Sequence, residues 1–283
     1  MARNTGLFRK KRVAREEVIA VKKGGNTEFD ESYNRLKDNL IYYSADGGHK
    51  VIQIESSIAG EGKTTLACNL SVSLALNDKK VVLVDLDFRK ARVHRAFKVS
   101  SQNGIGNYVS DKSVTVDDII KHTDYGVDLI TRGKSIYNSS LVLTSERIKA
   151  LIAELKERYD FVILDCPPVL LISDYINIAR LSDGILFVVA AGYTRKSAVK
   201  ETYTLLSKTD SKIIGAIMTF AENTTSGYSY YGRYGKYGHY GHYGHYGHYG
   251  HYGYGYGYYH EKDDEENSSN ADKKDNADGK KAK

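Results

Sequence analysis

The chain has 283 residues, of which 41% are hydrophobic, and this content excludes a fully disordered protein. No run approaches ~18 uncharged apolar residues, and the first residues lack the apolar segment of a secretory signal peptide, so we expect neither a transmembrane helix nor secretion. Two cysteines exclude a disulfide framework and favour a cytoplasmic chain with reduced thiols. The net charge of +6 equals the excess of eight basic over two acidic residues within residues 1–25. The remainder is therefore close to neutral, and we expect no nucleic-acid-binding face.

Composition predicts three parts. Residues 1–27 form a basic, polar arm, residues 28–220 form an α/β domain, and residues 221–283 are a low-complexity, Tyr/Gly/His-rich and charged tail. Two interpretations of the arm stay open. It is either a solvated segment, or one that lies on anionic lipid or on a partner near the membrane.

Apolar, strand-like runs alternate with helix-length segments in the middle part. The runs are continuous in Val, Ile and Leu, which is typical of strands buried on both faces. We expect strands at Val51–Glu55, Val81–Asp85, Val127–Thr131, Phe161–Asp165, Gly184–Ala190 and Ile213–Phe220, and helices at Thr64–Leu76, Thr144–Arg158 and Lys196–Lys208. This alternation predicts an α/β, doubly wound, mostly parallel sheet with helices on both faces.

The strongest motif lies between the first expected strand and the first expected helix, where residues 56–65 are Ser-Ser-Ile-Ala-Gly-Glu-Gly-Lys-Thr-Thr. In a phosphate-binding loop, glycines let backbone N–H groups point at phosphate oxygens, a lysine contacts the β- and γ-phosphates, and the next hydroxyl binds Mg²⁺. Ser57 stands where the motif has its first glycine. The residues predicted to bind the nucleotide are Ala59, Gly60, Glu61, Gly62, Lys63, Thr64 and Thr65. With this loop between strand and helix, the predicted sheet is of the P-loop NTPase-like class.

Two later strands carry acids at their ends. Asp85 and Asp87 close one, and Asp165, followed by Cys166, closes another. Acids at the carboxyl ends of parallel strands face the ligand crevice, and we expect Asp165 to help hold Mg²⁺. Because residues two apart share a face of a strand, both Asp85 and Asp87 are expected to reach the phosphates, one at the metal and the other as a base. The thiols of Cys68 and Cys166 are expected to be buried and inert, and His94 to be structural.

The tail begins with tyrosines and a Gly-His-Tyr repeat of period three. Fourteen of the 24 tyrosines fall between Tyr228 and Tyr259, and the absence of proline there argues against a collagen-like triple helix. So much glycine costs more backbone entropy than such a segment recovers by folding alone. The six histidines from His239 to His260 also allow adventitious binding of Zn²⁺ or Ni²⁺, or protonation near pH 6.

Together, these features resemble the bacterial tyrosine kinase family, in its Gram-positive form that works in capsule and exopolysaccharide synthesis. The resemblance rests on residues 56–65, on VVLVDLDFRK followed by His94, on FVILDCPP, and on the terminal tyrosines. It implies an ATP- and Mg²⁺-dependent protein-tyrosine autokinase, peripheral at the inner face of the membrane through a separate transmembrane adaptor. It also implies a homo-oligomer, with a ring as one arrangement, and a cognate tyrosine phosphatase.

The resemblance also assigns roles to residues. Lys63 and Thr64 would hold phosphate and Mg²⁺, Asp87 and Asp165 would support the metal, and Asp85 would accept the phenolic proton, with Asp85 and Asp87 open to exchange. The expected acceptors are Tyr228, Tyr230, Tyr231, Tyr234, Tyr237, Tyr240, Tyr243, Tyr246, Tyr249, Tyr252, Tyr254, Tyr256, Tyr258 and Tyr259. Transfer within one chain and transfer between chains both remain open.

Some positions depart from the family pattern. Ala59 and Ala91 replace prolines, and Thr219 replaces the asparagine that commonly ends the last strand. Asn34 and Lys37 replace the two arginines of the family's E-x-x-R-x-x-R interface pattern, which starts at Glu31 on a helix. The last two substitutions weaken the expectation of a ring, because bidentate arginine contacts are lost. Two other classes stay open: a partitioning or division-site (ParA/MinD-like) ATPase switch, against which Ile58 argues because those proteins usually carry a second lysine there, and a nucleotide-gated interaction protein.

Overall fold

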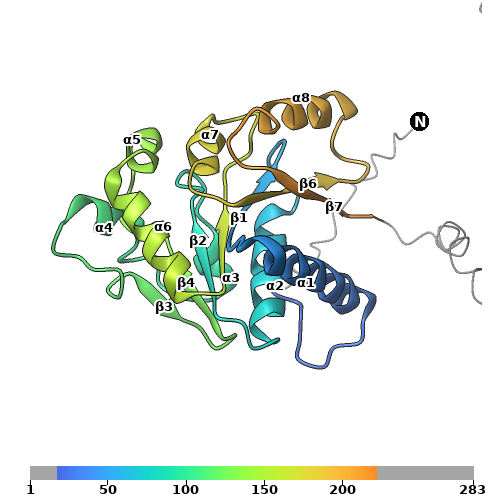
Figure 1. Ribbon diagram of the computed structural model, residues 1–283, viewed down its shortest axis with the longest axis horizontal. Coiled ribbons are helices and arrows are strands. Elements are labelled where there is room, and N and C mark those ends of the chain that lie inside the picture. The colour runs from blue at the N-terminus through green and yellow to red at the C-terminus, as the bar shows by residue number, and fades with distance from the viewer. Residues whose placement is uncertain (1–17, 222–283) are drawn as a thin grey trace, which may run out of the picture. The chain divides into compact units, whose positions relative to one another are not determined.

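A seven-stranded sheet forms the centre of the structure, a computed structural model that describes residues 18–221 (Figure 1). Its strands are β1 (Val51–Ser56), β2 (Val81–Asp85), β3 (Ile120–His122), β4 (Val127–Ile130), β5 (Phe161–Asp165), β6 (Gly184–Ala190) and β7 (Ile213–Thr219). They lie in the order β3-β4-β2-β5-β1-β6-β7, and every neighbouring pair is parallel except β3 and β4. The predicted doubly wound, mostly parallel sheet is confirmed.

The helices of the described part lie between and before the strands. They are α1 (Glu28–Gly47), α2 (Lys63–Ala75), α3 (Val93–Ala96), α4 (Ile105–Ser110), α5 (Ser139–Leu143), α6 (Glu146–Arg158), α7 (Asp174–Ala179) and α8 (Lys196–Leu206). The six expected strands and three expected helices are all present, with ends that shift by one or two residues. The antiparallel edge strand β3 and the short helices were not predicted.

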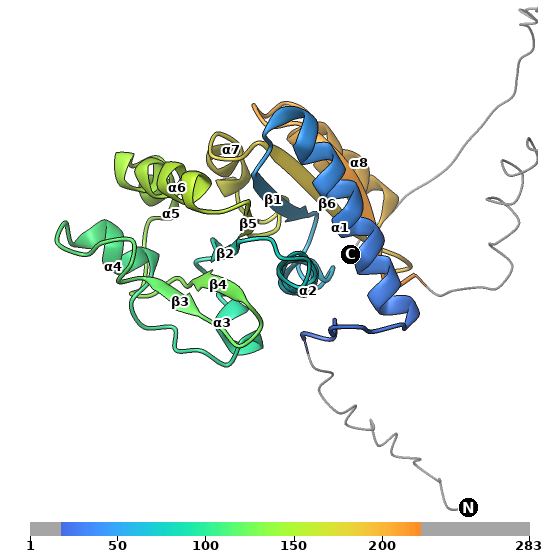
Figure 2. The same ribbon diagram turned by 60° about the horizontal axis from the view of Figure 1, so that its bottom comes forward.

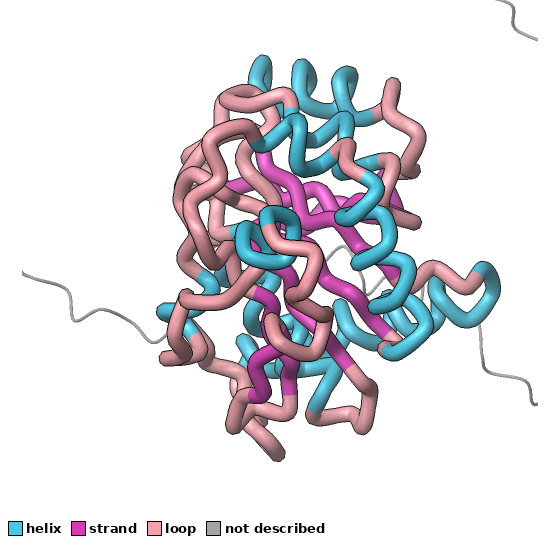
Figure 3. Tube along the Cα trace, turned by 90° about the vertical axis from the view of Figure 1, so that its left-hand side faces the viewer, coloured by secondary structure: helices cyan, strands magenta, loops and turns pink. Residues whose placement is uncertain are grey.

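Alternate residues of the central strands supply separate apolar clusters on the two faces of the sheet. Ile52 and Leu83 belong to the cluster that includes α1, α2 and α3, whereas Val82 and Val84 belong to the cluster that includes α4, α5 and α6. All four side chains are fully buried. Figure 2 shows the sheet between α2 and α3 on one side and α6 and α7 on the other, and Figure 3 shows the strands side by side inside a shell of helices and loops. Burial on both faces explains the continuous apolar runs.

The folded part begins earlier than the boundary at residue 27 that composition suggested. Ile19 and Val21 are buried in the cluster that contains α2. The Asn69 side chain on α2 accepts hydrogen bonds from the backbone N–H groups of Ala20 and Val21, at 2.8 and 3.1 Å. We call residues 18–22 the N-terminal strap. Composition did not single out this segment, because the short apolar run of residues 18–21 lies between two glutamates and two lysines and carries little weight in an average over the basic arm.

The tail from position 222 onward and the arm up to position 17 lie outside the described residues. The predicted acceptor tyrosines and the tail histidines therefore stay sequence-based expectations. Among residues 18–221, no helix combines the length and the apolar character that crossing a membrane requires.

Candidate active site

The predicted phosphate-binding loop joins the end of β1 to the start of α2. Gly60 and Gly62 have φ angles of 93° and 86°, a conformation that side-chain-bearing residues rarely adopt. Gly62 is also the residue that precedes the first turn of α2, and it offers no side-chain cap. The N–H groups at this helix start therefore keep their capacity to bind an anion, and the helix dipole favours negative charge at the same place.

Side chains more than a hundred positions later in the sequence stabilise this loop. The Glu61 carboxylate accepts hydrogen bonds from the Ile58 N–H at 2.6 Å and from the Thr194 hydroxyl. The Tyr193 hydroxyl donates to the carbonyl of Ala59 at 3.2 Å. Sequence reasoning missed Tyr193 and Thr194, because nothing local marks residues that act on a loop more than a hundred positions away.

Thr219, at the end of β7, also holds the loop. Its hydroxyl donates to the carbonyl of Glu61 at 2.7 Å, and a Cβ atom on Gly62 would lie 3.4 Å from its methyl group. Thr219, which stands where the family commonly has asparagine, therefore makes a structural contact with the loop. No residue is assigned to recognition of the adenine ring.

Two predicted acids meet the predicted phosphate lysine. Lys63 Nζ lies 3.7 Å from Asp87 Oδ2 and 3.8 Å from Asp165 Oδ1. The Thr64 hydroxyl donates to Asp165 Oδ2 at 2.8 Å. Residues from the P-loop, from the segment after β2 and from the end of β5 thus converge, as the sequence predicted.

Asp85 lies next to this group but has other partners. It pairs with Asp165 in the register of β2 and β5, and its side chain is fully buried. Asp85 Oδ2 accepts the N–H groups of Arg92 and Val93 at 3.1 and 3.2 Å, while Oδ1 has no hydrogen-bond partner among the described residues. The expected i, i+2 alternation does not apply, because β2 ends at Asp85 and Asp87 lies in the following loop.

The site holds three buried carboxylates against one buried ammonium group. Burial, with the neighbouring charge of Asp165, raises the pKa of Asp85 to about 8, and burial also raises the pKa of Asp165. Burial alone would lower the pKa of Lys63, but the charges of Asp165 and Asp87 outweigh it and raise that pKa. Such an excess of acid is costly without a cation. The hard oxygen donors of Thr64, Asp87 and Asp165 fit Mg²⁺, and the glycine-rich loop fits phosphate.

A buried acid beneath the loop was missed in the sequence. Glu55, on β1, is fully buried, accepts the Gln53 side-chain amide at 2.5 Å, and has its pKa raised to about 8 by burial. The signal in the sequence was an acid inside the otherwise mostly apolar strand VIQIES.

The thiols of Cys166 and Cys68 are fully buried and burial raises both pKa values, which confirms the expectation of buried thiols. His94, on α3, makes no hydrogen bond through its buried Nδ1 to any described residue.

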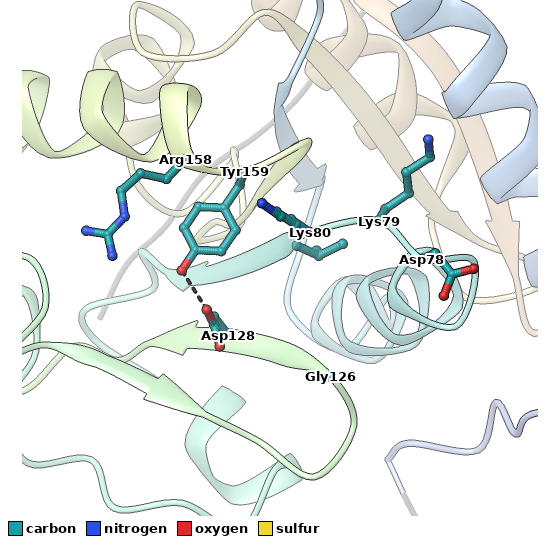
Figure 4. A pocket seen from close by; sticks show the side chains of 8 residues that line it. Asp78, Lys79, Lys80, Gly126, Asp128, Arg158 and Tyr159 are labelled. Atoms are coloured by element: carbon teal, nitrogen blue, oxygen red, sulfur yellow. Dashed lines mark hydrogen bonds between the residues drawn. The ribbon is translucent and has the colours of Figure 1, made fainter.

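An open cavity of about 480 Å³ lies at the other end of the strands (Figure 4). Its lining includes the residues that precede β2, β4 and β5, namely Lys80, Gly126 and Tyr159. Within it, the Tyr159 hydroxyl donates to Asp128 Oδ2 at 2.6 Å. This cavity is separate from the P-loop, because the two lie at opposite ends of parallel strands.

Comparison with known proteins identifies the family. The model of the AAA domain family matches residues 49–215. The tyrosine-protein kinase YwqD of Bacillus subtilis is 34% identical over 188 residues, which cover 66% of this chain and 79% of that protein. The chain belongs to the bacterial protein-tyrosine kinases. The kinase is also 28% identical to the tyrosine-protein kinase CpsD of Streptococcus agalactiae, over 76% of this chain and 93% of that protein. It matches only 28% of the longer tyrosine-protein kinase etk of Escherichia coli.

Solved structures agree with this assignment. The kinase superposes on the chimerical protein CapA2B2 with a TM-score of 0.65 and 29% identity, over 68% of this chain and 85% of that one. For the kinase domain of Escherichia coli ETK, the TM-score is 0.63 and the identity 28%, over 68% of this chain and 77% of that one. The septum site-determining protein MinD of Pyrococcus horikoshii, at 24% identity and a TM-score of 0.52, shares the fold alone. The site of the kinase is thus a nucleotide site of the P-loop type.

Proposed function

We propose that this kinase transfers the γ-phosphoryl group of ATP, with Mg²⁺, to the tyrosines of its own C-terminal tail. The observation that carries the proposal is the convergence of Lys63 and Thr64 with Asp87 and Asp165, in a chain whose relatives are tyrosine kinases. Fourteen tyrosines, most of them beside Gly or His, supply candidate phenolic acceptors on the same chain.

The side chains divide the work. The N–H groups around Gly60 and Gly62 bind phosphate oxygens, and Lys63 holds the β- and γ-phosphates. Thr64, Asp87 and Asp165 would hold Mg²⁺, which would supply positive charge to the phosphates. The phenolic oxygen then bonds to the γ-phosphorus as the bond to ADP breaks.

We assign the base for the phenolic proton to Asp85. Its pKa of about 8 suits proton transfer near neutral pH, and Oδ1 is unpaired among the described residues. Because Asp85 is fully buried, this role requires the segment after β2 to move when nucleotide and tyrosine bind. The alternative exchanges the roles of Asp85 and Asp87. The D85N and D87N variants distinguish the two, because loss of the base lowers kcat with little change in Mg²⁺ affinity, whereas loss of a metal-binding group weakens Mg²⁺ binding.

The test of the activity is an autophosphorylation assay on the full chain with ATP and Mg²⁺, in the presence and absence of the cytoplasmic segment of a transmembrane adaptor. We expect phosphotyrosine that disappears in Lys63→Met and in a variant with all fourteen tail tyrosines changed to Phe. ATP hydrolysis without phosphotyrosine, even with adaptor, would instead identify an ATPase switch.

We further propose that the kinase works at the inner membrane face through that adaptor and controls capsular or exopolysaccharide synthesis or export, with a phosphatase that reverses it. Each phosphate adds about −1.5 to −2 charges, so a phosphorylated tail would repel its neighbours in a homo-oligomer. The α1 side chain of Lys37 lies beside Asp38 at 3.3 Å and is 11% exposed, so it offers little to a partner. Light scattering with and without ATP, on wild-type and Tyr→Phe tails, tests whether phosphorylation loosens the oligomer.

A further inference from the structure

A cationic surface follows Asp85 and Asp87 in the chain. Arg89, Lys90, Arg92, Arg95 and Lys98 are all exposed, and residues 88–110 contain no acid. We call these five side chains the α3 surface. No described carboxylate lies within ion-pair distance of the α3 surface, whereas the exposed cations of Arg35, Lys149 and Arg158 each pair with at least one. Unpaired exposed lysines occur elsewhere too, but the α3 surface gathers five unpaired cations within ten consecutive positions. Five unpaired cations so close together repel one another, so the surface favours an anionic partner.

This surface is attached directly to the active site. The backbone N–H of Lys90 donates to Asp87 Oδ1 at 2.9 Å, and that of Arg92 donates to Asp85 Oδ2 at 3.1 Å. Arg132 Nη1 holds the carbonyl of Phe88 at 3.1 Å. The α3 surface therefore starts beside the catalytic carboxylates, and an anionic peptide bound there would pass close to them.

The chain itself contains a segment of complementary charge. Five of the six residues 261–266 are acidic, and this run starts two positions after Tyr259. At roughly 3.3–3.6 Å per extended residue, Asp263 lies within about 15 Å of Tyr259 along the chain. An acidic run held on the α3 surface would leave the adjacent tyrosines within reach of the site.

We propose that the α3 surface of one copy binds residues 261–266 of a second copy and thereby presents the nearest tyrosines, Tyr258 and Tyr259 first, for phosphorylation. This proposal rests on the proposed kinase activity and adds a substrate preference to it: a tyrosine followed by acidic residues. Tyrosines of the Gly-His-Tyr repeat, farther from the run, are modified later.

The experiment measures transfer between full-length copies. The enzyme carries Phe at all fourteen tail tyrosines and amides in place of the five acids of residues 261–266, so that its own tail neither accepts phosphate nor competes. The substrate is the full-length Lys63→Met protein. The double variant R92E/R95E in the enzyme is expected to lower kcat/KM about tenfold, mainly through KM, and more strongly at low salt. The matched control K200E/K208E changes two exposed lysines on and just after α8 and is expected to leave the rate unchanged.

A charge swap separates docking from a direct effect on the site. Changing the five substrate acids to Lys is expected to slow transfer by the wild-type surface and to restore it with R92E/R95E. Fluorescence anisotropy of a labelled peptide of residues 256–268 measures the same docking without catalysis. Peptide binding without any phosphotyrosine would overturn the proposed function alone. Equal rates for all charge pairings would overturn the docking. So would an R92E/R95E variant that binds anionic phosphatidylglycerol vesicles less tightly than wild type but binds the peptide and phosphorylates the substrate equally well.

Discussion

Replacing Asp85 by Asn is expected to stabilise the kinase against unfolding in the absence of nucleotide, while it removes phosphotransfer. The carboxylate is fully buried, faces Asp165 across β2 and β5, and has its pKa raised to about 8 by burial. The amide oxygen of Asn can still accept the N–H groups of Arg92 and Val93. The substitution therefore keeps the hydrogen bonds and removes a charge that the fold accommodates poorly.

The sign and size follow from proton linkage. In the unfolded chain Asp85 titrates near its usual 3.8, and in the folded chain near 8, so between these values the folded state holds the extra proton. Wild-type stability consequently falls as pH rises through this window. Each tenfold change in proton affinity corresponds to about 1.36 kcal/mol. We expect the advantage of the D85N variant in unfolding free energy to grow by about 1–3 kcal/mol between pH 5.5 and pH 8.5.

Urea unfolding of both proteins at these two pH values measures the effect. The perturbed acids away from this site are present in both proteins and cancel in the difference. Asp165 interacts with Asp85, so the measured change belongs to the pair. Asp183→Asn is the control of opposite sign: burial alone would raise the pKa of Asp183, but Lys156 Nζ at 2.6 Å and two backbone N–H groups outweigh it and lower that pKa. Its loss should destabilise the protein at both pH values. A D85N variant that is less stable at pH 8.5, or whose advantage is the same at both, would refute the electrostatic argument.

Three further substitutions probe the loop, the metal-binding group and the strap. Gly62→Ala and Gly48→Ala both place a side chain at positive φ and should each cost about 1 kcal/mol by urea unfolding, but only Gly62→Ala should abolish nucleotide binding measured by calorimetry; equal binding in both would contradict the assigned loop. Thr64→Ala removes the hydroxyl that bonds to Asp165 and should weaken Mg²⁺-dependent ADP binding at least tenfold, whereas Thr64→Ser should retain it. Asn69→Ala breaks the side-chain hydrogen bonds to the strap and should lower stability by about 2 kcal/mol, with proteolysis near residue 20 as a second measure; unchanged stability would show that the strap is held by apolar contacts alone.

The central strands and the P-loop could be predicted because their signals are local. Four apolar residues followed by Asp predict β2 and β5 without reference to the rest of the chain. The short helices have no such signal, since four to six residues hold together only through tertiary contacts. Arg147 on α6 illustrates this, because its guanidinium donates to the carbonyls of Tyr108, Asp111 and Val114 and so holds α4 and the loop after it. No sequence pattern within α4 itself predicts that contact.

The site could be predicted as a set of residues but not as a set of contacts. Lys63, Thr64 and Asp165 could be predicted to lie at one edge of the sheet, because their motifs follow or end parallel strands and the carboxyl ends of those strands share that edge. The bracing of the loop by Tyr193 and Thr194 depends on where the segment after β6 comes to lie, which is a property of the whole fold. For the proposed acceptor tyrosines the reverse holds, because all the evidence for them comes from the sequence and none from contacts.

Asp85 and Asp87 show where strand periodicity no longer predicts which side chains share a face. An i, i+2 pair shares a face only while both residues belong to the strand, and the chain leaves β2 at Asp85. Beyond that point, hydrogen bonds from backbone N–H groups orient the two carboxylates. The N–H groups of Arg92 and Val93 donate to Asp85, and that of Lys90 donates to Asp87, which lies close to Lys63. The two carboxylates thus differ in partner, burial and charge environment. Because their environments differ in this way, D85N and D87N should fail in different steps.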